Sequence, residues 1–214
     1  MSYVRDRAFI LKKEPLREHD RRYTLYGRDH GLLIAVARGA SHKRSKQAGH
    51  LEPFSEVEVM IAIGRAADKL AVARQISRPA FNTLAGCAVM GAFVDLVSSV
   101  THPGVSDARI FDVLRETRDA CAALSTEPTP ERARLIHAGA ALKLLDLLGY
   151  SPPVEGALLN FLRRFPLTDA LRVTAAAEVF TATAAFVEDA LQHAPLKHAP
   201  HGPATIAALL TPAG

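Results

Sequence analysis

Over the first 80 residues, apolar and polar side chains alternate in short runs separated by turn-forming residues. In the run 21–28, Tyr23 and Leu25 fall on one side, because successive side chains of a strand point to opposite faces. The side chains that share the other side are Arg22, Thr24, Tyr26 and Arg28. The runs predicted to be strands are 4–11, 21–28, 32–38, 54–63 and 70–76.

After Arg78 and Pro79 the repeat of apolar positions lengthens to nearly four residues and alanine becomes abundant, which is typical of helices. The segments predicted to be helical are 82–99, 106–124, 130–148 and 168–192. Ser106 or Asp107 is suited to cap the start of the second helix, and Thr129 to cap the third.

Five short strands without a long helix among them favour a small barrel of the oligonucleotide/oligosaccharide-binding (OB) type. The sequence therefore predicts a two-domain α+β protein. We expect a five-stranded OB-type β-barrel at residues 1–79, followed by an all-α helical domain at residues 80–214. The Lys-Lys-Glu-Pro run at residues 12–15 is predicted to end the first strand.

The longest apolar run, residues 84–100, is interrupted by Asp95 and two serines and is shorter than the roughly 20 residues that a membrane helix needs. A buried helix is predicted there. Cys87 and Cys121 stand far apart without a CxxC partner and are predicted to be small core residues. The charges at the start of the chain do not fit a signal peptide, so we expect a cytoplasmic location.

Charge is distributed unevenly along the chain. Residues 1–80 carry 16 Lys and Arg against 9 Asp and Glu, a net charge of +7, whereas residues 81–214 carry 10 against 13, a net charge of −3. The total of +4 therefore conceals a basic first domain. This asymmetry favours a module that binds polyanions, joined to a domain with another task.

Basic residues of the expected barrel are interleaved with aromatic ones, a combination that suits nucleic acid. Lys and Arg attract phosphates, while flat rings offer stacking faces that accept any base. The candidate phosphate contacts are Arg21, Arg22, Arg28, Arg38, Lys43, Arg44 and Lys46. Tyr26 is the candidate stacking ring, because it shares a strand face with the arginines of its run. The alternative is that these are ordinary solvated charges on a small barrel.

Patterns of catalytic and metal-binding residues are absent from the sequence. It contains no phosphate-binding loop, dinucleotide fingerprint, nucleophile elbow or His-Glu-x-x-His helix, so no catalytic residue, cofactor or metal is predicted. His193, His198 and His201 come close together, but the prolines around them favour a solvated tail over a metal site. Arg163 and Arg164, beside apolar residues, are either an ordinary helix edge or a docking point for an acidic peptide.

The barrel sequence also resembles a known family. The run 18–33 (EHDRRYTLYGRDHGLL) resembles the second and third strands of the OB domain of the RecO family. Residues 35–40 (AVARGA), 43–46 (KRSK) and 51–54 (LEPF) follow in the order and spacing of that family. In the helical half, residues 110–114 (IFDVL) and 144–152 (LLDLLGYSP) resemble family segments less specifically.

This resemblance implies a cytoplasmic, nucleoid-associated DNA repair protein that is not an enzyme. It implies a recombination mediator that binds single- and double-stranded DNA, anneals complementary strands, and works with RecR to load RecA on strands coated by single-stranded DNA-binding protein. Many members carry a cysteine-rich zinc-binding insertion after the equivalent of residues 150–152, whereas here Val154, Glu155 and Gly156 run directly into Ala157. Zinc is therefore not expected in this chain.

The uneven charge agrees with that role. A basic barrel reduces the repulsion between two strands, and the less basic helical domain is left for protein partners, including the acidic tail of the coating protein. Two other functions stay open. One is an RNA-binding or ribosome-associated OB protein whose helical half is an oligomerisation module. The other is an adaptor whose basic barrel binds an acidic protein and no nucleic acid.

Overall fold

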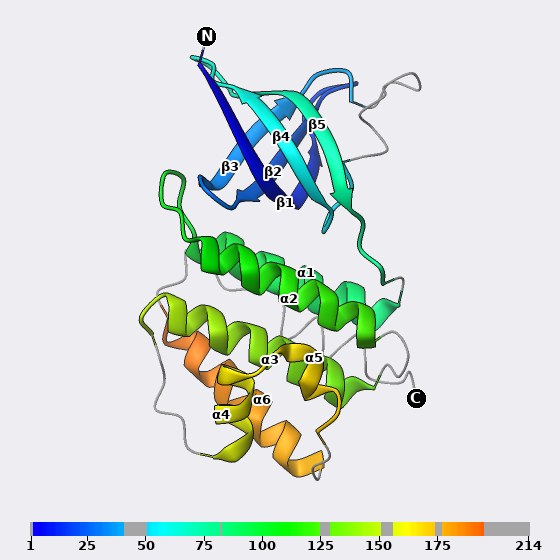
Figure 1. The fold of residues 1–214 in the computed structure, drawn as a ribbon, viewed down its shortest axis with the longest axis vertical. Coiled ribbons are helices and arrows are strands. Elements are labelled where there is room, and N and C mark those ends of the chain that lie inside the picture. The colour runs from blue at the N-terminus through cyan, green and yellow to red at the C-terminus, as the bar shows by residue number, and fades with distance from the viewer. Residues whose placement is uncertain are drawn as a thin grey trace. The chain divides into compact units, whose positions relative to one another are not determined.

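The computed structural model describes residues 2–40, 51–81, 83–124, 129–150, 156–173 and 177–194. A five-stranded barrel followed by a helical region is confirmed (Figure 1). The chain divides into two compact units: residues 1–79 with 101–111, and residues 80–100 with 112–214. The division after residue 79 falls where a domain boundary is expected, but residues 101–111 join the barrel unit.

The strands close the barrel in the order β1-β2-β3-β5-β4. Their bounds are β1 Tyr3–Pro15, β2 Arg21–Gly27, β3 Gly31–Ala37, β4 Glu56–Ala62 and β5 Lys69–Ser77. Neighbouring strands are antiparallel except β3 and β5, which are parallel. The number of strands and the closure are those of an OB barrel.

β1 is longer than the expected strand 4–11, because it pairs with two neighbours. Tyr3 to Phe9 pair with β4, and Ala8 to Pro15 pair with β2. A shift in register between Ile10 and Lys12 lets the strand bend from one partner to the other. The prediction that residues 12–15 end the strand is therefore wrong: only Pro15, at its last position, stops it.

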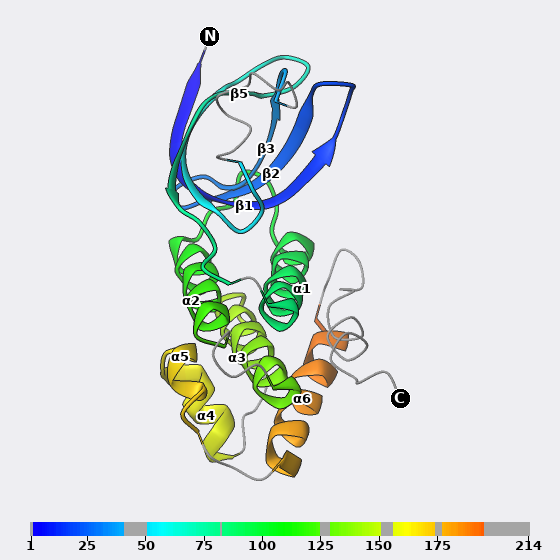
Figure 2. The same ribbon diagram turned by 90° about the vertical axis from the view of Figure 1, so that its right-hand side faces the viewer.

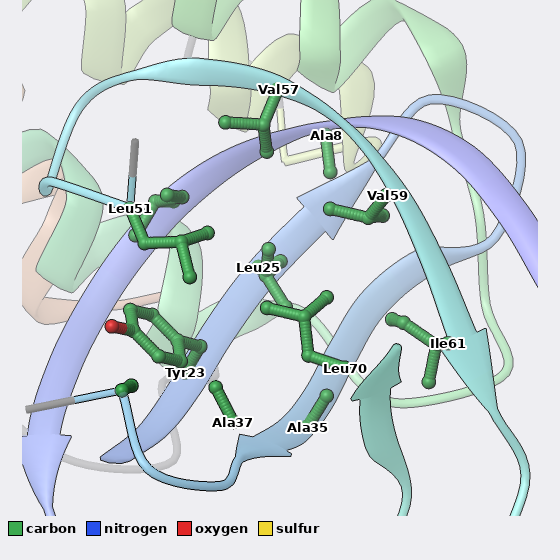
Figure 3. Close-up of a cluster of buried hydrophobic side chains, with 12 residues drawn as sticks. Ala8, Tyr23, Leu25, Ala35, Ala37, Leu51, Val57, Val59, Ile61 and Leu70 are labelled. Carbon is green, nitrogen blue, oxygen red and sulfur yellow. The ribbon is translucent and has the colours of Figure 1, made fainter. Parts of the chain in front are cut away.

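The barrel encloses an apolar core to which all five strands contribute (Figure 3). Tyr23 and Leu25 are completely buried there, as the alternation in β2 predicts. The buried members of this core are Ala8, Ile10, Tyr23, Leu25, Ala35, Ala37, Ala40, Leu51, Val57, Val59, Ile61 and Leu70. Side chains that point outward from the same strands are left to form the outer faces of the barrel.

A buried carboxylate fastens the turn between β2 and β3 onto β1. The Asp6 side chain is fully buried, and its oxygens accept the backbone N–H groups of Asp29 at 3.2 Å and His30 at 3.0 Å. The Nδ1 atom of His30 lies 3.0 Å from Asp6 Oδ2. A Cβ atom on Gly27 would stand 2.1 Å from that same oxygen, so the close approach requires glycine.

The helical unit is built around α3. The helices are α1 Leu84–Val100, α2 Ala108–Leu124, α3 Pro130–Leu147, α4 Ala157–Arg164, α5 Leu167–Ala170 and α6 Ala177–Gln192. α3 packs against α1, α4, α5 and α6 (Figure 2). The predicted caps are confirmed: Asp107 Oδ1 accepts the N–H of Arg109, and Thr129 Oγ1 accepts the N–H of Arg132.

The expected helix 168–192 is wrong, because α5 ends in a turn at residues 171–172 and α6 begins only at Ala177. The β-branched Val173 that follows this turn is a weak helix former, so it favours a break. The break was not predicted because the segment is rich in alanine, which favours a helix.

The apolar run 84–100 is a largely buried helix, as predicted. Within the described ranges, no helix is both long and apolar enough to cross a membrane. Cys121 is buried, and burial raises the pKa of its thiol to about 12. Cys87 is exposed, which corrects its assignment to the core. It lies three residues after Leu84, another exposed residue, on the outward stripe of α1.

Candidate nucleic-acid interface

The outer side of the β1–β2–β3 sheet carries three rows of paired residues. The register aligns Glu14 with Arg22 and Val36, Lys12 with Thr24 and Ile34, and Phe9 with Tyr26 and Leu32. The first two rows are at least partly exposed, whereas the third is buried. We call the first two rows, together with Arg38, the β2–β3 face.

Arg22 and Arg38 lie at one end of this face, and Arg21 lies next to them in the chain with its side chain on the other side of β2. Arg21 opens β2 and pairs with Ala37, the last residue of β3, so Arg38 follows immediately beside it. Asp20 ties the two strand ends together. Its Oδ1 accepts the N–H of Gly39 at 3.0 Å, and its carbonyl oxygen accepts a hydrogen bond from Arg21 Nη1 at 3.1 Å. Two predicted phosphate contacts, Arg22 and Arg38, are thus brought together, whereas Arg21 has the strand parity of the buried Tyr23.

Carboxylates offset only part of the charge at this end. Arg22 Nε donates to Glu14 Oε2 at 3.2 Å, but these side chains are 47% and 44% exposed. A pair as exposed as this contributes only about 0–1 kcal/mol, so a phosphate can replace the carboxylate at little cost. Arg38 is exposed and makes no side-chain hydrogen bond or ion pair with any residue that the structure describes.

Sequence analysis missed Lys12 and Ile34 on this face. Lys12 fell in the run expected to end β1, and Ile34 in a strand that is apolar on both sides. Only the register with β2 shows that both point outward beside Thr24. Ile34 is 47% exposed, an apolar surface next to cationic side chains.

Tyr26 lies in the buried row, and its prediction as a stacking ring is wrong. Its side chain is completely buried, and its hydroxyl donates to the backbone oxygen of Asp107 at 3.1 Å. Burial raises the pKa of the phenol above its usual value. The alternation placed Tyr26 on the outer face correctly, but another part of the chain covers it there.

The cover is the segment 101–111, which joins α1 to α2 and includes the first turn of α2. Pro103 forms bridges with Gly31 and Leu32, and the ring of Phe111 lies 5.0 Å from that of Phe9. A Cβ atom on Gly31, whose φ is +64°, would stand 2.1 Å from the carbonyl oxygen of Val105. No local pattern in β2 signals this cover, because it comes from about 80 residues further along the chain.

Arg28 does not lie near the other arginines of the candidate site. It follows Gly27 at the far end of β2, about 20 Å from Arg22 along the strand. Its guanidinium group lies 5.8 Å from the centre of the Phe111 ring, a cation–π distance. Lys43, Arg44 and Lys46, the other predicted contacts, lie outside the described residues.

Among the other side chains considered for binding, Arg163 has a local partner. Arg163 makes a two-pronged ion pair with Asp146 of α3, at 2.5 and 2.7 Å, and so joins α4 to α3. Arg164 is exposed. His193 is exposed at the end of α6, while His198 and His201 lie outside the described residues. Across the ranges described, no group of three or more His, Cys, Asp and Glu is placed to hold a metal.

Comparison with known proteins gives a family match over the barrel. The family described as "Recombination protein O N terminal" matches residues 1–79. Over 161 residues the chain is 32% identical to "DNA repair protein RecO" of Rubrobacter xylanophilus. The aligned region covers 73% of this chain and 61% of the relative. Over 153 residues it is 31% identical to "DNA repair protein RecO" of Bifidobacterium longum subsp. infantis, covering 71% and 63%. The chain thus spans somewhat less than two thirds of these relatives.

Proposed function

The chain belongs to the RecO family through its amino-terminal domain, and from this premise we propose that it is a non-catalytic DNA repair protein that binds single-stranded DNA on its β2–β3 face. The observation that carries the proposal is the convergence of Arg22 and Arg38 at one end of that face. Cations held close together attract a phosphodiester chain and release its counterions.

The wider role is recombination mediation. The protein anneals complementary strands and, with RecR, helps load RecA on strands coated by single-stranded DNA-binding protein. Residues 1–79 serve as the nucleic-acid-binding domain, where Lys43, Arg44 and Lys46 extend the site, and residues 80–214 bind the protein partners. The net charges of +7 and −3 in the two parts of the chain support this division of labour.

The test is annealing of two complementary fluorescent strands, with and without single-stranded DNA-binding protein. We expect the protein to accelerate pairing in both cases, and the double variant Arg22→Ala/Arg38→Ala to be slower. The control is Arg164→Ala/Arg172→Ala, which removes two exposed arginines of the helical unit and should anneal uncoated strands at the wild-type rate.

An unchanged rate in the Arg22→Ala/Arg38→Ala variant would remove the β2–β3 face as the site. Matched RNA and DNA oligonucleotides should also compete for the protein. A clear preference for RNA would replace the mediator with the RNA-binding alternative, and failure to bind either at low salt would favour the acidic-protein adaptor.

A further inference from the structure

The outer side of the β1–β4–β5 sheet is a second basic surface. The register aligns Tyr3 with Ala62 and Lys69, Arg5 with Met60 and Val72, and Arg7 with Glu58 and Arg74. We call these nine residues the β1–β4–β5 face. A shallow groove runs over its last two rows, with Met60 and Val72 in its lining.

Cations outnumber exposed carboxylates on this face. It carries Arg5, Arg7, Lys69 and Arg74 against one exposed acid, Glu58. Arg74 Nη1 lies 3.9 Å from Glu58 Oε2, but the two side chains are 80% and 59% exposed, so their attraction is weak.

The other cations are accessible too. Arg7 pairs with the buried Glu56 and still exposes 42% of its side chain. Arg5 and Lys69 are exposed, and neither makes a side-chain hydrogen bond or ion pair with a residue in the described part of the chain.

This face also has the exposed ring that the β2–β3 face lacks. Tyr3 is 52% exposed, whereas Tyr23 and Tyr26 of the same barrel are completely buried. Tyr3 and Arg5 point to the same side of β1, about 7 Å apart along the strand. A ring for stacking beside a cation for the phosphate is the combination that holds single strands without sequence preference.

We propose that the β1–β4–β5 face is a second site for single-stranded nucleic acid, so that one barrel holds two strands at once. The inference rests on the proposed function, in which the β2–β3 face holds the first strand. β1 serves both faces: its first half supplies Tyr3, Arg5 and Arg7, and its second half supplies Lys12 and Glu14. Because the barrel is closed, the two faces lie on different parts of its outer surface.

Two sites on one barrel would accelerate annealing by raising the local concentration of one strand near its complement. A strand held on one side meets its complement at the effective concentration that a short link gives, on the order of millimolar. Each site neutralises part of the charge that keeps free strands apart. An acidic protein segment could use the cations of this face but has no special need of the Tyr3 ring, so nucleic acid is the favoured ligand.

The experiment counts strands bound per chain. The full chain is titrated into a fluorescent dT oligonucleotide of about 15 nucleotides, near the upper site size of one OB barrel, at low salt and well above the dissociation constant. We expect two strands per chain for the wild type and one for each of Arg5→Glu/Arg74→Glu and Arg22→Glu/Arg38→Glu. Arg164→Glu/Arg172→Glu has the same change in charge outside the barrel and should still bind two.

Tyr3→Ala should weaken the second binding event about 5- to 150-fold, the loss of one base stack, whereas Tyr3→Phe should preserve it. Arg5→Glu/Arg74→Glu should also anneal slowly although it still binds one strand.

One strand per chain in the wild type, or two in Arg5→Glu/Arg74→Glu, would overturn the inference and leave the proposed function standing. No binding by any form would instead overturn the proposed function. If Arg5→Glu/Arg74→Glu keeps two strands but no longer binds a polyglutamate peptide, the face belongs to an acidic protein, and the inference is again overturned.

Discussion

At the scale of single residues, burial decides what an aromatic ring can do. Tyr3 and Tyr26 both point outward from barrel strands, yet one is half exposed and the other is completely covered. Strand parity, which the sequence shows, determines the side of the sheet on which each ring lies. Whether the side of Tyr26 meets solvent depends on residues 101–111, and this is why the choice of Tyr26 as a stacking ring failed. Tyr3 was missed because it lies one residue before the predicted strand 4–11.

Burial also controls protonation, as His137 of α3 shows. Its side chain is buried, and the loss of hydration lowers the pKa of the imidazole to about 4. In the unfolded chain the pKa is about 6.5, so the unfolded state takes up a proton at a higher pH than the folded state. The contribution to stability is therefore complete above pH 6.5 and is lost as the pH falls toward 4.

We expect the free energy of unfolding to fall by about 2 kcal/mol between pH 7 and pH 5 through this group alone. Urea denaturation at the two pH values measures it, and the His137→Leu variant should lose that part of the pH dependence. The same pH dependence in variant and wild type would show that the buried imidazole is not kept neutral.

Asp6 is a second residue whose role follows from burial. Its two oxygens accept hydrogen bonds from the N–H groups of Asp29 and His30, and an amide nitrogen in place of either oxygen would face a donor. Asp6→Asn should therefore lower the unfolding free energy by about 1–3 kcal/mol.

The matched control is Asp68→Asn. Asp68 accepts the N–H of Gly64 at 3.0 Å in an exposed turn, where water can replace the bond, so its loss should cost less than about 1 kcal/mol. Thermal unfolding compares the two variants. Similar losses in both would mean that the Asp6 carboxylate does not fasten the turn.

At the scale of elements, the connection between α1 and α2 belongs to the barrel it covers. It approaches β3 so closely that Gly31 is required both by its φ of +64° and by the carbonyl oxygen of Val105. Gly39 has almost the same φ, +62°, but nothing lies within 4 Å of its missing Cβ. A substitution at Gly39 therefore tests backbone strain alone, whereas a substitution at Gly31 tests strain and steric contact together.

Gly39→Ala should lower the unfolding free energy by about 1–2 kcal/mol, the cost of a left-handed conformation for a residue with a Cβ. Gly31→Ala carries the same strain and must also displace the connection, so it should lose clearly more. Chemical denaturation of both variants gives the comparison. Equal losses would show that the connection does not press on β3.

The elements themselves were largely predictable. Five strands and the longer helices that follow were read from the period of the apolar positions, and the caps at Asp107 and Thr129 from local chemistry. The failures lie where a non-local contact decides. β1 runs through residues 12–15 because a second partner strand pairs with it, and the turn after α5 lies in a segment of helical composition.

At the scale of the whole molecule, charge asymmetry was the most informative property of the sequence. It placed the candidate site on the barrel, and the register then brought Arg22 and Arg38 together while leaving Arg21 on the other side of the sheet and Arg28 at the far end of β2. Composition cannot sort cations among the sides of a closed sheet, because that requires knowing which strands are neighbours. The second basic face, which β4 and β5 bring beside the start of β1, was hidden for the same reason.

The central claim is that the barrel binds single-stranded DNA through its cations, and the salt dependence of affinity tests it most directly. Fluorescence anisotropy of a labelled single strand with the full chain gives log K against log salt. For about 4 to 6 neutralised phosphates the slope should be roughly −3 to −4, and Arg22→Ala/Arg38→Ala should make it shallower by about 1.4. A wild-type slope near zero, or the same steep slope in the variant, would contradict the account.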